Sequence, residues 1–414
     1  MAYIPRITDA ELKRKLESSG AILIRGPKAC GKTESAGQFA RSILQMDQDP
    51  QVAALMNAAP QRLLLGQTPR LIDEWQVQPD IWNYVRHEVD RRKLPEQFIL
   101  TGSATPGKSE SDIKMHSGAG RFTKLDMRTM SWQELGFSTG KISLEGLFRG
   151  AKIDIDDAPV DVEQIVERII TGGFPTLVGK KLRSAIDLNQ AYVDLLAEVD
   201  ISRVPEVKRD PVKVRALLRS LARNTATLAE ITTFTADTGI SRPTIYDYLG
   251  ALERLMIVED QPAWNAHLRS SVSLRKTPKR HFTDVCLAVA ALGATKESLL
   301  ADMKYTGFLF ESLVVHELRV YGQACEAKVY HYHDTNNLEV DAIVQKYNGD
   351  WSAFEIKLGI GQINEAAANL LKFASVVDTD KLSAPKSLNI ITGTGISYTR
   401  PDGINVISIA SLGI

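Results

Sequence analysis

The chain has 414 residues, of which 44% are hydrophobic and 24% charged, and its 50 basic and 50 acidic side chains leave a formal net charge of zero. This composition is that of a globular protein of about two to three domains, and it excludes a basic field over the whole surface, so nucleic-acid binding would need a local patch. Three cysteines far apart in sequence, no run of about 18 apolar residues and no signal-peptide core predict a cytoplasmic protein without disulfide scaffold, zinc site or membrane contact.

The first informative pattern is GPKACGKT at residues 26–33, which satisfies G-x-x-x-x-G-K-[ST]. An apolar run at 21–24 predicts a strand before it, and helical spacing over 34–44 predicts a helix after it. Such a loop turns its N–H groups toward phosphate oxygens at a helix N-terminus, with Lys32 on the β/γ-phosphates and Thr33 on Mg²⁺. The predicted ATP-binding residues are Gly26, Pro27, Lys28, Ala29, Cys30, Gly31, Lys32, Thr33 and Glu34.

A carboxylate pair, Asp73 and Glu74, follows the apolar end of the next predicted strand. Asp73 is expected to hold Mg²⁺, and Glu74 to polarise the attacking water. A third strand, 97–103, ends in small polar residues, so that Thr101 or Ser103 either contacts the γ-phosphate or the water, or belongs to a plain turn.

Arg121 follows a glycine-rich approach and has three possible roles. It stabilises the transferred phosphoryl group in cis, does so from a neighbouring subunit of a homo-oligomer, or is a structural arginine.

Taken together, these residues resemble the prokaryotic AAA-type ATPases that carry a C-terminal domain of unknown function. The resemblance runs essentially from end to end. It includes segments 3–6, 26–33, 71–74 with Gln76, 100–103, 120–121, Ser131, Glu134 and 172–175. It departs at Arg128-Thr129, where the family more often has proline. The resemblance implies a sheet of the additional-strand type, with the Asp73 strand between the P-loop strand and its neighbour; it names no substrate.

The middle of the chain begins with a predicted linker or loop at 141–160, followed by helices at 162–170 and 182–199. Helices at 229–237 and 242–255, joined by a turn containing Gly239, predict a helix-turn-helix of the winged-helix type. Arg242 and Thr244 would face DNA at the start of the second helix, where Asp247 is unfavourable for phosphate. The predicted phosphate contacts of the following hairpin are Arg269, Arg275, Lys276, Lys279 and Arg280. A rigid protein-binding module is the alternative.

The C-terminal part places Glu311 on an amphipathic helix, Asp341 on a strand, and Glu355 and Lys357 on one face of the next strand. This Asp followed by Glu-x-Lys resembles the restriction-endonuclease-like superfamily. In that chemistry Glu311, Asp341 and Glu355 would hold a second divalent metal, and Lys357 would orient water or stabilise the phosphorane. Related ATPases also keep this scaffold in degraded form.

We therefore expect an α/β protein with an AAA/ASCE-type P-loop domain at 1–150, a helical linker or lid at 151–200, a winged-helix domain at 201–290 and a PD-(D/E)xK endonuclease-like domain at 300–414. The expected function is Mg²⁺-dependent ATP hydrolysis coupled to DNA binding or processing. The rival is a nucleotide-gated signalling or scaffold ATPase whose rear domains bind protein and cut nothing.

Overall fold

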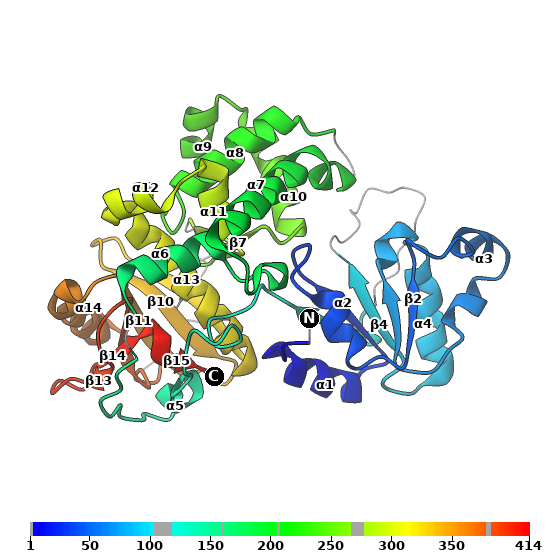
Figure 1. Ribbon diagram of the computed structural model, residues 1–414. Coiled ribbons are helices and arrows are strands. Elements are labelled where there is room, and N and C mark those ends of the chain that lie inside the picture. The colour runs from blue at the N-terminus through cyan, green and yellow to red at the C-terminus, as the bar shows by residue number, and fades with distance from the viewer. Residues whose placement is uncertain (1–2, 103–117, 159, 205–207, 266–276, 378–381) are drawn as a thin grey trace.

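The computed structural model describes residues 3–102, 118–158, 160–204, 208–265, 277–377 and 382–414. Figure 1 shows three units: an N-terminal sheet flanked by helices, a helical unit, and a C-terminal sheet that is flanked by α13 and α14. The helical unit lies above the other two and meets both, and the first helix lies near the C-terminal unit. No helix among the described residues is long and apolar enough to cross a membrane.

The N-terminal unit contains a sheet of five described parallel strands in the order β2-β3-β4-β1-β5. Its strands are β1 (Ala21–Arg25), β2 (Ser42–Gln45), β3 (Arg70–Asp73), β4 (Phe98–Gly102) and β5 (Phe122–Asp126), and its helices are α1 (Thr8–Ser18), α2 (Lys32–Gly37), α3 (Val52–Ala58) and α4 (Ile81–Arg92). The central strands are buried on both faces, which explains their continuous apolar runs.

Two expectations about this sheet are wrong. The strand between the P-loop strand β1 and the Asp73 strand β3 is β4; β3 itself lies one place further out. The helix expected at 34–44 ends at Gly37, and the chain re-enters the sheet as β2. Glycine weakens a helix, and pairing β2 with β3 buries Leu44, so tertiary packing outweighs the apolar helical spacing.

The structure confirms the helices expected at 162–170 and 182–199, and it also contains helices where 229–237 and 242–255 were predicted. The members of the helical unit are α6 (Val162–Thr171), α7 (Leu182–Glu198), α8 (Pro211–Arg223), α9 (Ile231–Thr238), α10 (Arg242–Arg254), α11 (Val285–Leu292) and α12 (Lys296–Ala301), with the antiparallel strands β7 (Val258–Gln261) and β8 (Lys279–Phe282). Gly239 has φ of 68°, the left-handed conformation that ends α9.

The C-terminal unit has a sheet of six described strands in the order β13-β14-β12-β11-β10-β9. Its members are α13 (Met303–Ala324), β9 (Ala327–His333), β10 (Glu339–Lys346), β11 (Trp351–Lys357), α14 (Ile363–Val376), β12 (Leu388–Thr392), β13 (Tyr398–Thr399) and β14 (Asn405–Ser408). The predicted hairpin of Asp341 with Glu355 and Lys357 is confirmed as antiparallel β10 and β11.

The segment at 141–160, predicted as a linker or loop, contains a short strand and a short helix. It forms β6 (Ile142–Ser143) and α5 (Leu144–Phe148), and β6 pairs with the last strand, β15 (Leu412–Gly413). Lys346 of β10 forms an ion pair with Glu145 of α5 over 2.5 Å. Residues 142–148 therefore pack on the C-terminal unit, because Leu144, Leu147 and Phe148 bury there in a shared core.

Candidate active site

The phosphate-binding loop begins where β1 ends, and glycine is required at two of its positions. A Cβ atom on Gly26 would lie 2.2 Å from the carbonyl oxygen of Met127, and Gly31 has φ of 100°. Ala29 also adopts positive φ, 62°. The loop is therefore held in a shape that side chains at 26 and 31 would disturb.

Lys32 opens α2 and is almost completely buried. Its ammonium group donates to the carbonyl oxygens of Gly26 and Pro27, both over 2.9 Å. Of the other predicted loop residues, Cys30 is buried, whereas Lys28, Ala29 and Glu34 are exposed. The buried ammonium group thus sits within the ring formed by its own loop.

Asp73 accepts hydrogen bonds from two hydroxyl groups at the carboxyl edge of the sheet. Its Oδ1 accepts hydrogen bonds from Thr33 over 2.9 Å and from Thr101 over 2.5 Å. Thr101 therefore bonds to the carboxylate of the neighbouring strand, and Ser103 lies outside the described residues. Hydroxyl and carboxylate oxygens are ligands that suit Mg²⁺, so the donor set of Thr33 and Asp73 fits that ion.

Glu74 follows Asp73 in the left-handed conformation, with φ of 52°. Its carboxylate accepts a hydrogen bond from Gln76, and burial raises its pKa above the ordinary value, although Gln76 opposes the shift. A raised pKa makes a carboxylate a better proton acceptor near neutral pH. Gly102 lies beside it, and a Cβ atom there would lie 2.0 Å from Oε1 of Gln76, so a larger residue would displace the Gln76 amide.

A cavity of about 660 Å³ extends from this edge to the helical unit. Its N-terminal wall includes Glu74 and Lys28, and its helical wall carries apolar side chains: Tyr192, Leu196, Leu255 and Ile257. Two contacts hold the walls together: Lys28 pairs with Asp200 over 3.1 Å, and Tyr192 donates to the carbonyl oxygen of Lys28 over 3.2 Å. The cavity combines a polar end with an apolar end, as a nucleotide requires.

Arg6 supports the loop from behind, a role that sequence reasoning missed. Its guanidinium group donates to the carbonyl oxygens of Cys30 and Arg128 over 2.9 and 2.8 Å, and pairs with Glu134 over 3.0 Å. Glu134 also accepts from the backbone of Ile7 and Ser131. The signal for this network was the resemblance, which included Arg6, Ser131 and Glu134 but gave them no role.

Arg121 lies at the other end of the sheet from the phosphate-binding loop. Its carbonyl oxygen accepts from Ala21, where β1 begins, and its side chain pairs with Asp90 of α4 over 2.8 Å. The loop follows Arg25, where β1 ends. The expectation that Arg121 acts in cis on the phosphate-binding loop of its own chain is therefore wrong. The contacts with Ala21 and Asp90 instead fit a structural arginine.

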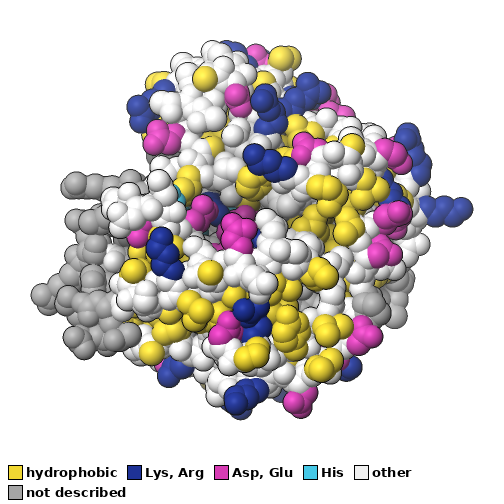
Figure 2. Space-filling view, turned by 90° about the vertical axis from the view of Figure 1, so that its left-hand side faces the viewer, with side chains coloured by type: hydrophobic (Ala, Val, Ile, Leu, Met, Phe, Trp, Pro, Cys, Tyr) yellow, Lys and Arg dark blue, Asp and Glu magenta, His cyan; other side chains and the backbone are white. Residues whose placement is uncertain are grey.

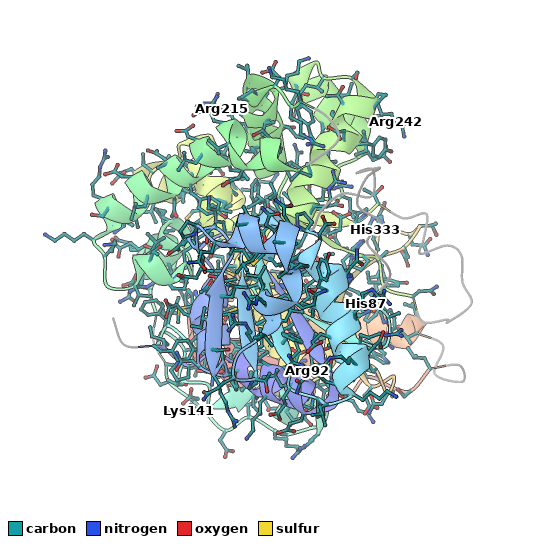
Figure 3. The ribbon with its side chains drawn as sticks, turned by 90° about the vertical axis from the view of Figure 1, so that its right-hand side faces the viewer. His87, Arg92, Lys141, Arg215, Arg242 and His333 are labelled. Carbon is teal, nitrogen blue, oxygen red and sulfur yellow. The ribbon has the colours of Figure 1, made fainter. Side chains whose placement is uncertain are left out.

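The predicted DNA-contacting residues Arg242 and Thr244 lie at the start of α10. Arg242 is exposed and stacks on Tyr246 at 5.8 Å from the ring centroid, at the outer rim of the helical unit (Figure 3). Thr244 is half-buried and shares a 2.8 Å hydrogen bond with Ser241. Asp247 pairs with the buried Arg209 over 2.8 Å, so its charge is compensated within the protein.

Two cations of the predicted basic hairpin, Lys279 and Arg280, do not form the expected phosphate-binding patch. Lys279 is buried against carboxylates of the C-terminal unit, and Arg280 pairs with Asp260 over 3.2 Å and donates to the carbonyl oxygen of Ala229. Neither side chain is free to contact phosphate, because pairing with an internal acid stabilises a buried cation. Arg269, Arg275 and Lys276 lie outside the described residues.

The C-terminal constellation does bring together Asp341, Glu355 and Lys357. The Lys357 ammonium group lies 3.1 Å from Asp341 and 2.7 Å from Glu355, and Asn369 donates to Glu355 over 2.8 Å. Burial raises the pKa of Glu355, whereas Lys357 and Lys279 lower the pKa of Asp341 against the opposing effect of burial. Glu311 is buried and pairs with Lys279 over 2.7 Å.

These carboxylates do not form the predicted second metal centre. Among the described residues, no group of three or more His, Cys, Asp or Glu side chains is arranged to hold a metal ion. The physical reason is that lysine ammonium groups lie between the carboxylates. Lys357 is bound to two acids rather than directed at a reacting water.

The parallel sheet, the glycine loop and the Asp73–Glu74 edge together have the arrangement of a P-loop nucleotide-binding domain. In agreement, residues 18–136 match the family described as AAA domain. Residues 162–298 match a domain of unknown function, DUF8612, and residues 306–412 match another, DUF4143. Uncharacterized proteins of Mycobacterium bovis and Mycobacterium tuberculosis are each 23% identical over 353 residues, covering 84% of this chain and 72% of theirs.

Solved structures show weaker likeness. The Walker-type ATPase of Pyrococcus abyssi has a TM-score of 0.43 at 13% identity, covering 68% of this chain and 94% of that one. AMPPCP-bound DnaA from Aquifex aeolicus has a TM-score of 0.28 at 12% identity, covering 61% and 89%. The Aeropyrum pernix Orc1 protein in complex with DNA has a TM-score of 0.27 at 13% identity, covering 73% and 96%. None of the three is similar enough to assign a partner to this chain.

Proposed function

We propose that this protein hydrolyses ATP with Mg²⁺ in the site between the N-terminal sheet and the helical unit. The observation that carries the proposal is the convergence of Thr33 and Thr101 on Asp73, next to Glu74 and the glycine loop. Thr33 and Asp73 would hold Mg²⁺, which supplies positive charge near the phosphates. The apolar wall with Leu255 and Ile257 suits a nucleoside.

The roles of the side chains follow from their positions. Lys32 would bind the terminal phosphates once its ammonium group exchanges two carbonyl partners for phosphate oxygens. Glu74 would accept a proton from the attacking water, helped by the raised pKa that burial gives it. Thr101 keeps the Asp73 carboxylate in place.

The test compares Lys32→Ala with Lys13→Ala, a lysine exposed on α1. We expect Lys32→Ala to lose MgATP binding in calorimetry and at least about a hundredfold in turnover, since the P-loop lysine contributes charge to both binding and the transition state. Lys13→Ala should retain both. Circular dichroism and melting of each variant check the fold. Equal turnover in the two variants would exclude this site.

We further propose that the helical unit is a winged-helix module that binds DNA through the start of α10. The order of α8, α9, α10 and the β7–β8 hairpin supports the module, and the exposed Arg242 supports the contact. The pairing of Asp247 with Arg209 reduces its repulsion of phosphate. On the face in Figure 2, which is opposite the face that shows Arg242 in Figure 3, basic side chains lie among acidic ones, so that face offers no continuous basic surface.

The DNA proposal is tested with fluorescence anisotropy on a labelled duplex. Arg242→Ala should weaken binding by about tenfold at low salt, whereas Arg183→Ala, an exposed arginine of α7, should not. ATP turnover is measured with and without the same duplex. If neither binding nor stimulation occurs, the rival holds: a nucleotide-gated scaffold ATPase whose rear units bind protein.

The C-terminal unit we assign to an endonuclease-like fold, supported by its succession α13, β9, β10, β11, α14, β12 and by the meeting of Asp341, Glu355 and Lys357. Strand cutting is not part of the proposed function, because ammonium groups neutralise these carboxylates. A nicking assay on supercoiled DNA with Mg²⁺ or Mn²⁺ should give no product above that of Asp341→Asn.

A further inference from the structure

Lys279 crosses from the helical unit into the acidic cluster of the C-terminal unit. It belongs to β8, and its side chain is 2% exposed. Its ammonium nitrogen lies 2.7 Å from Oε1 of Glu311, 2.6 Å from Oε1 of Glu339 and 3.8 Å from Oδ1 of Asp341. Helix α13 and strand β10 of the C-terminal unit thus place three carboxylates around a single ammonium group, which belongs to the helical unit.

Among the described residues, the C-terminal unit contributes fewer ammonium groups than carboxyl groups to this cluster. Glu311, Asp341 and Glu355 are each buried, and Glu339 is partly exposed. The C-terminal unit itself contributes the ammonium group of Lys357 to these contacts. Buried carboxylates without a counter-charge are strongly destabilising. Lys279 therefore adds a second ammonium group to a cluster to which the C-terminal unit contributes one.

The lysine is fixed in place by the hairpin that carries it. Gln261, paired with Lys279 in the β7–β8 register, donates to the carbonyl oxygens of Tyr330 and Asp341, both over 2.9 Å. Trp264, just beyond β7, packs at 4.8 Å between ring centroids against Trp351 of β11. These contacts hold the hairpin against the sheet, in the position from which the Lys279 side chain reaches the cluster.

We propose that Lys279 is a built-in cation that occupies a latent divalent-metal site formed by Glu311, Glu339 and Asp341. The Lys279 ammonium group lies in close contact with the carboxylates of Glu311 and Glu339, and the carboxylate of Asp341 completes the cluster as a longer ion pair. A metal such as Mn²⁺ needs the same oxygens at closer range and in the same position, so the two cations exclude each other. The C-terminal unit consequently binds no metal here while Lys279 is present. This proposal goes beyond the ATPase function and does not depend on it.

The test is Mn²⁺ binding by the full chain without nucleotide, measured by calorimetry. Wild type and Lys386→Ala, which removes a partly exposed lysine paired with Asp350, should show no Mn²⁺ site that depends on Asp341. Lys279→Ala should bind Mn²⁺ at least about tenfold more tightly than wild type. The double variant Lys279→Ala with Asp341→Asn should lose that gain. Mn²⁺ bound by the wild type and lost in Asp341→Asn would overturn the proposal.

A second measurement covers loss of stability in Lys279→Ala. Its melting temperature should rise with added Mn²⁺, because the metal replaces the missing charge, whereas that of the double variant should not. A Lys279→Ala protein that neither binds Mn²⁺ nor is stabilised by it would overturn the proposal and leave Lys279 as a structural counter-ion. Lys279→Arg, which retains the charge, should fold and continue to exclude Mn²⁺.

Discussion

The hydroxyl group of Thr101 donates a hydrogen bond to Oδ1 of Asp73 over 2.5 Å, linking the ends of two neighbouring parallel strands. The same oxygen accepts from Thr33 over 2.9 Å. Thr101 is buried in β4, and its hydroxyl group points to the Asp73 carboxylate at the end of β3. This relationship makes Thr101 a positioning residue for the proposed magnesium ligand.

Thr101→Val retains the volume of the side chain but removes this hydrogen bond. We expect ATP turnover to fall by about tenfold at limiting Mg²⁺ and to recover partly at high Mg²⁺, because Asp73 is less well oriented. Thr101→Ser should restore most of the activity. The measurement is a Mg²⁺ titration of turnover for the three proteins; identical Mg²⁺ curves for wild type and Thr101→Val would contradict the positioning role.

Glu74→Gln separates nucleotide binding from hydrolysis. We expect MgATP to bind and turnover to fall by about a hundredfold or more, since an amide cannot accept the proton. Because burial raises the pKa of Glu74, the acid limb of the wild-type pH–rate profile should lie above the ordinary carboxyl value of 4.5.

The stability of Glu74→Gln provides an independent check. The folded protein disfavours the charged carboxylate, so the amide should melt at the same or a higher temperature at neutral pH. Below the ordinary pKa, where the acid is protonated in both states, this difference should disappear. Turnover in Glu74→Gln equal to that of wild type would exclude Glu74 as the base.

Arg121→Ala tests the position of that arginine at the far end of β1. Its side chain is 40% exposed and pairs with Asp90, so we expect turnover within about twofold of wild type and little change in the melting temperature, because solvent screens an exposed ion pair. Asp90→Asn is the matched partner variant. Wild-type protein is also mixed with increasing amounts of Arg121→Ala. If the turnover per wild-type subunit falls as the share of the variant rises, Arg121 acts in trans on a neighbouring subunit.

Sequence reasoning located the phosphate-binding loop, the Asp73–Glu74 pair and the β10–β11 hairpin because each is a local pattern. The strand order that the family resemblance implied was wrong, and local spacing could not correct it, because strand order depends on crossovers between strands. Sequence reasoning also took the five cations at 269–280 as one exposed patch. The burial of Lys279 is decided by Glu311 and Glu339, which lie 32 and 60 positions further along the chain.

The contact of Glu259 with Arg128 and Arg319 joins all three units. Arg128 follows β5, Glu259 lies on β7 and Arg319 on α13, with nitrogen–oxygen distances of 3.0 and 3.2 Å. Although burial favours the neutral acid, the two guanidinium groups lower the pKa of Glu259 from 4.5 to about 2. Glu259→Gln leaves both arginines without their charge partner, so we expect a loss on the order of 3 kcal/mol in unfolding free energy at pH 7.

The pH dependence of this loss has a defined sign. A carboxyl whose folded pKa is depressed stabilises the protein above its unfolded pKa, and that stability is lost as pH falls through the folded pKa. Urea unfolding of wild type and Glu259→Gln should therefore differ fully above about pH 5 and converge toward pH 2. Glu326→Gln, which removes an exposed pair with Arg14, should cost less than about 1 kcal/mol at any pH. A Glu259→Gln loss no larger than that of Glu326→Gln would show that the three units are held together without this ion pair.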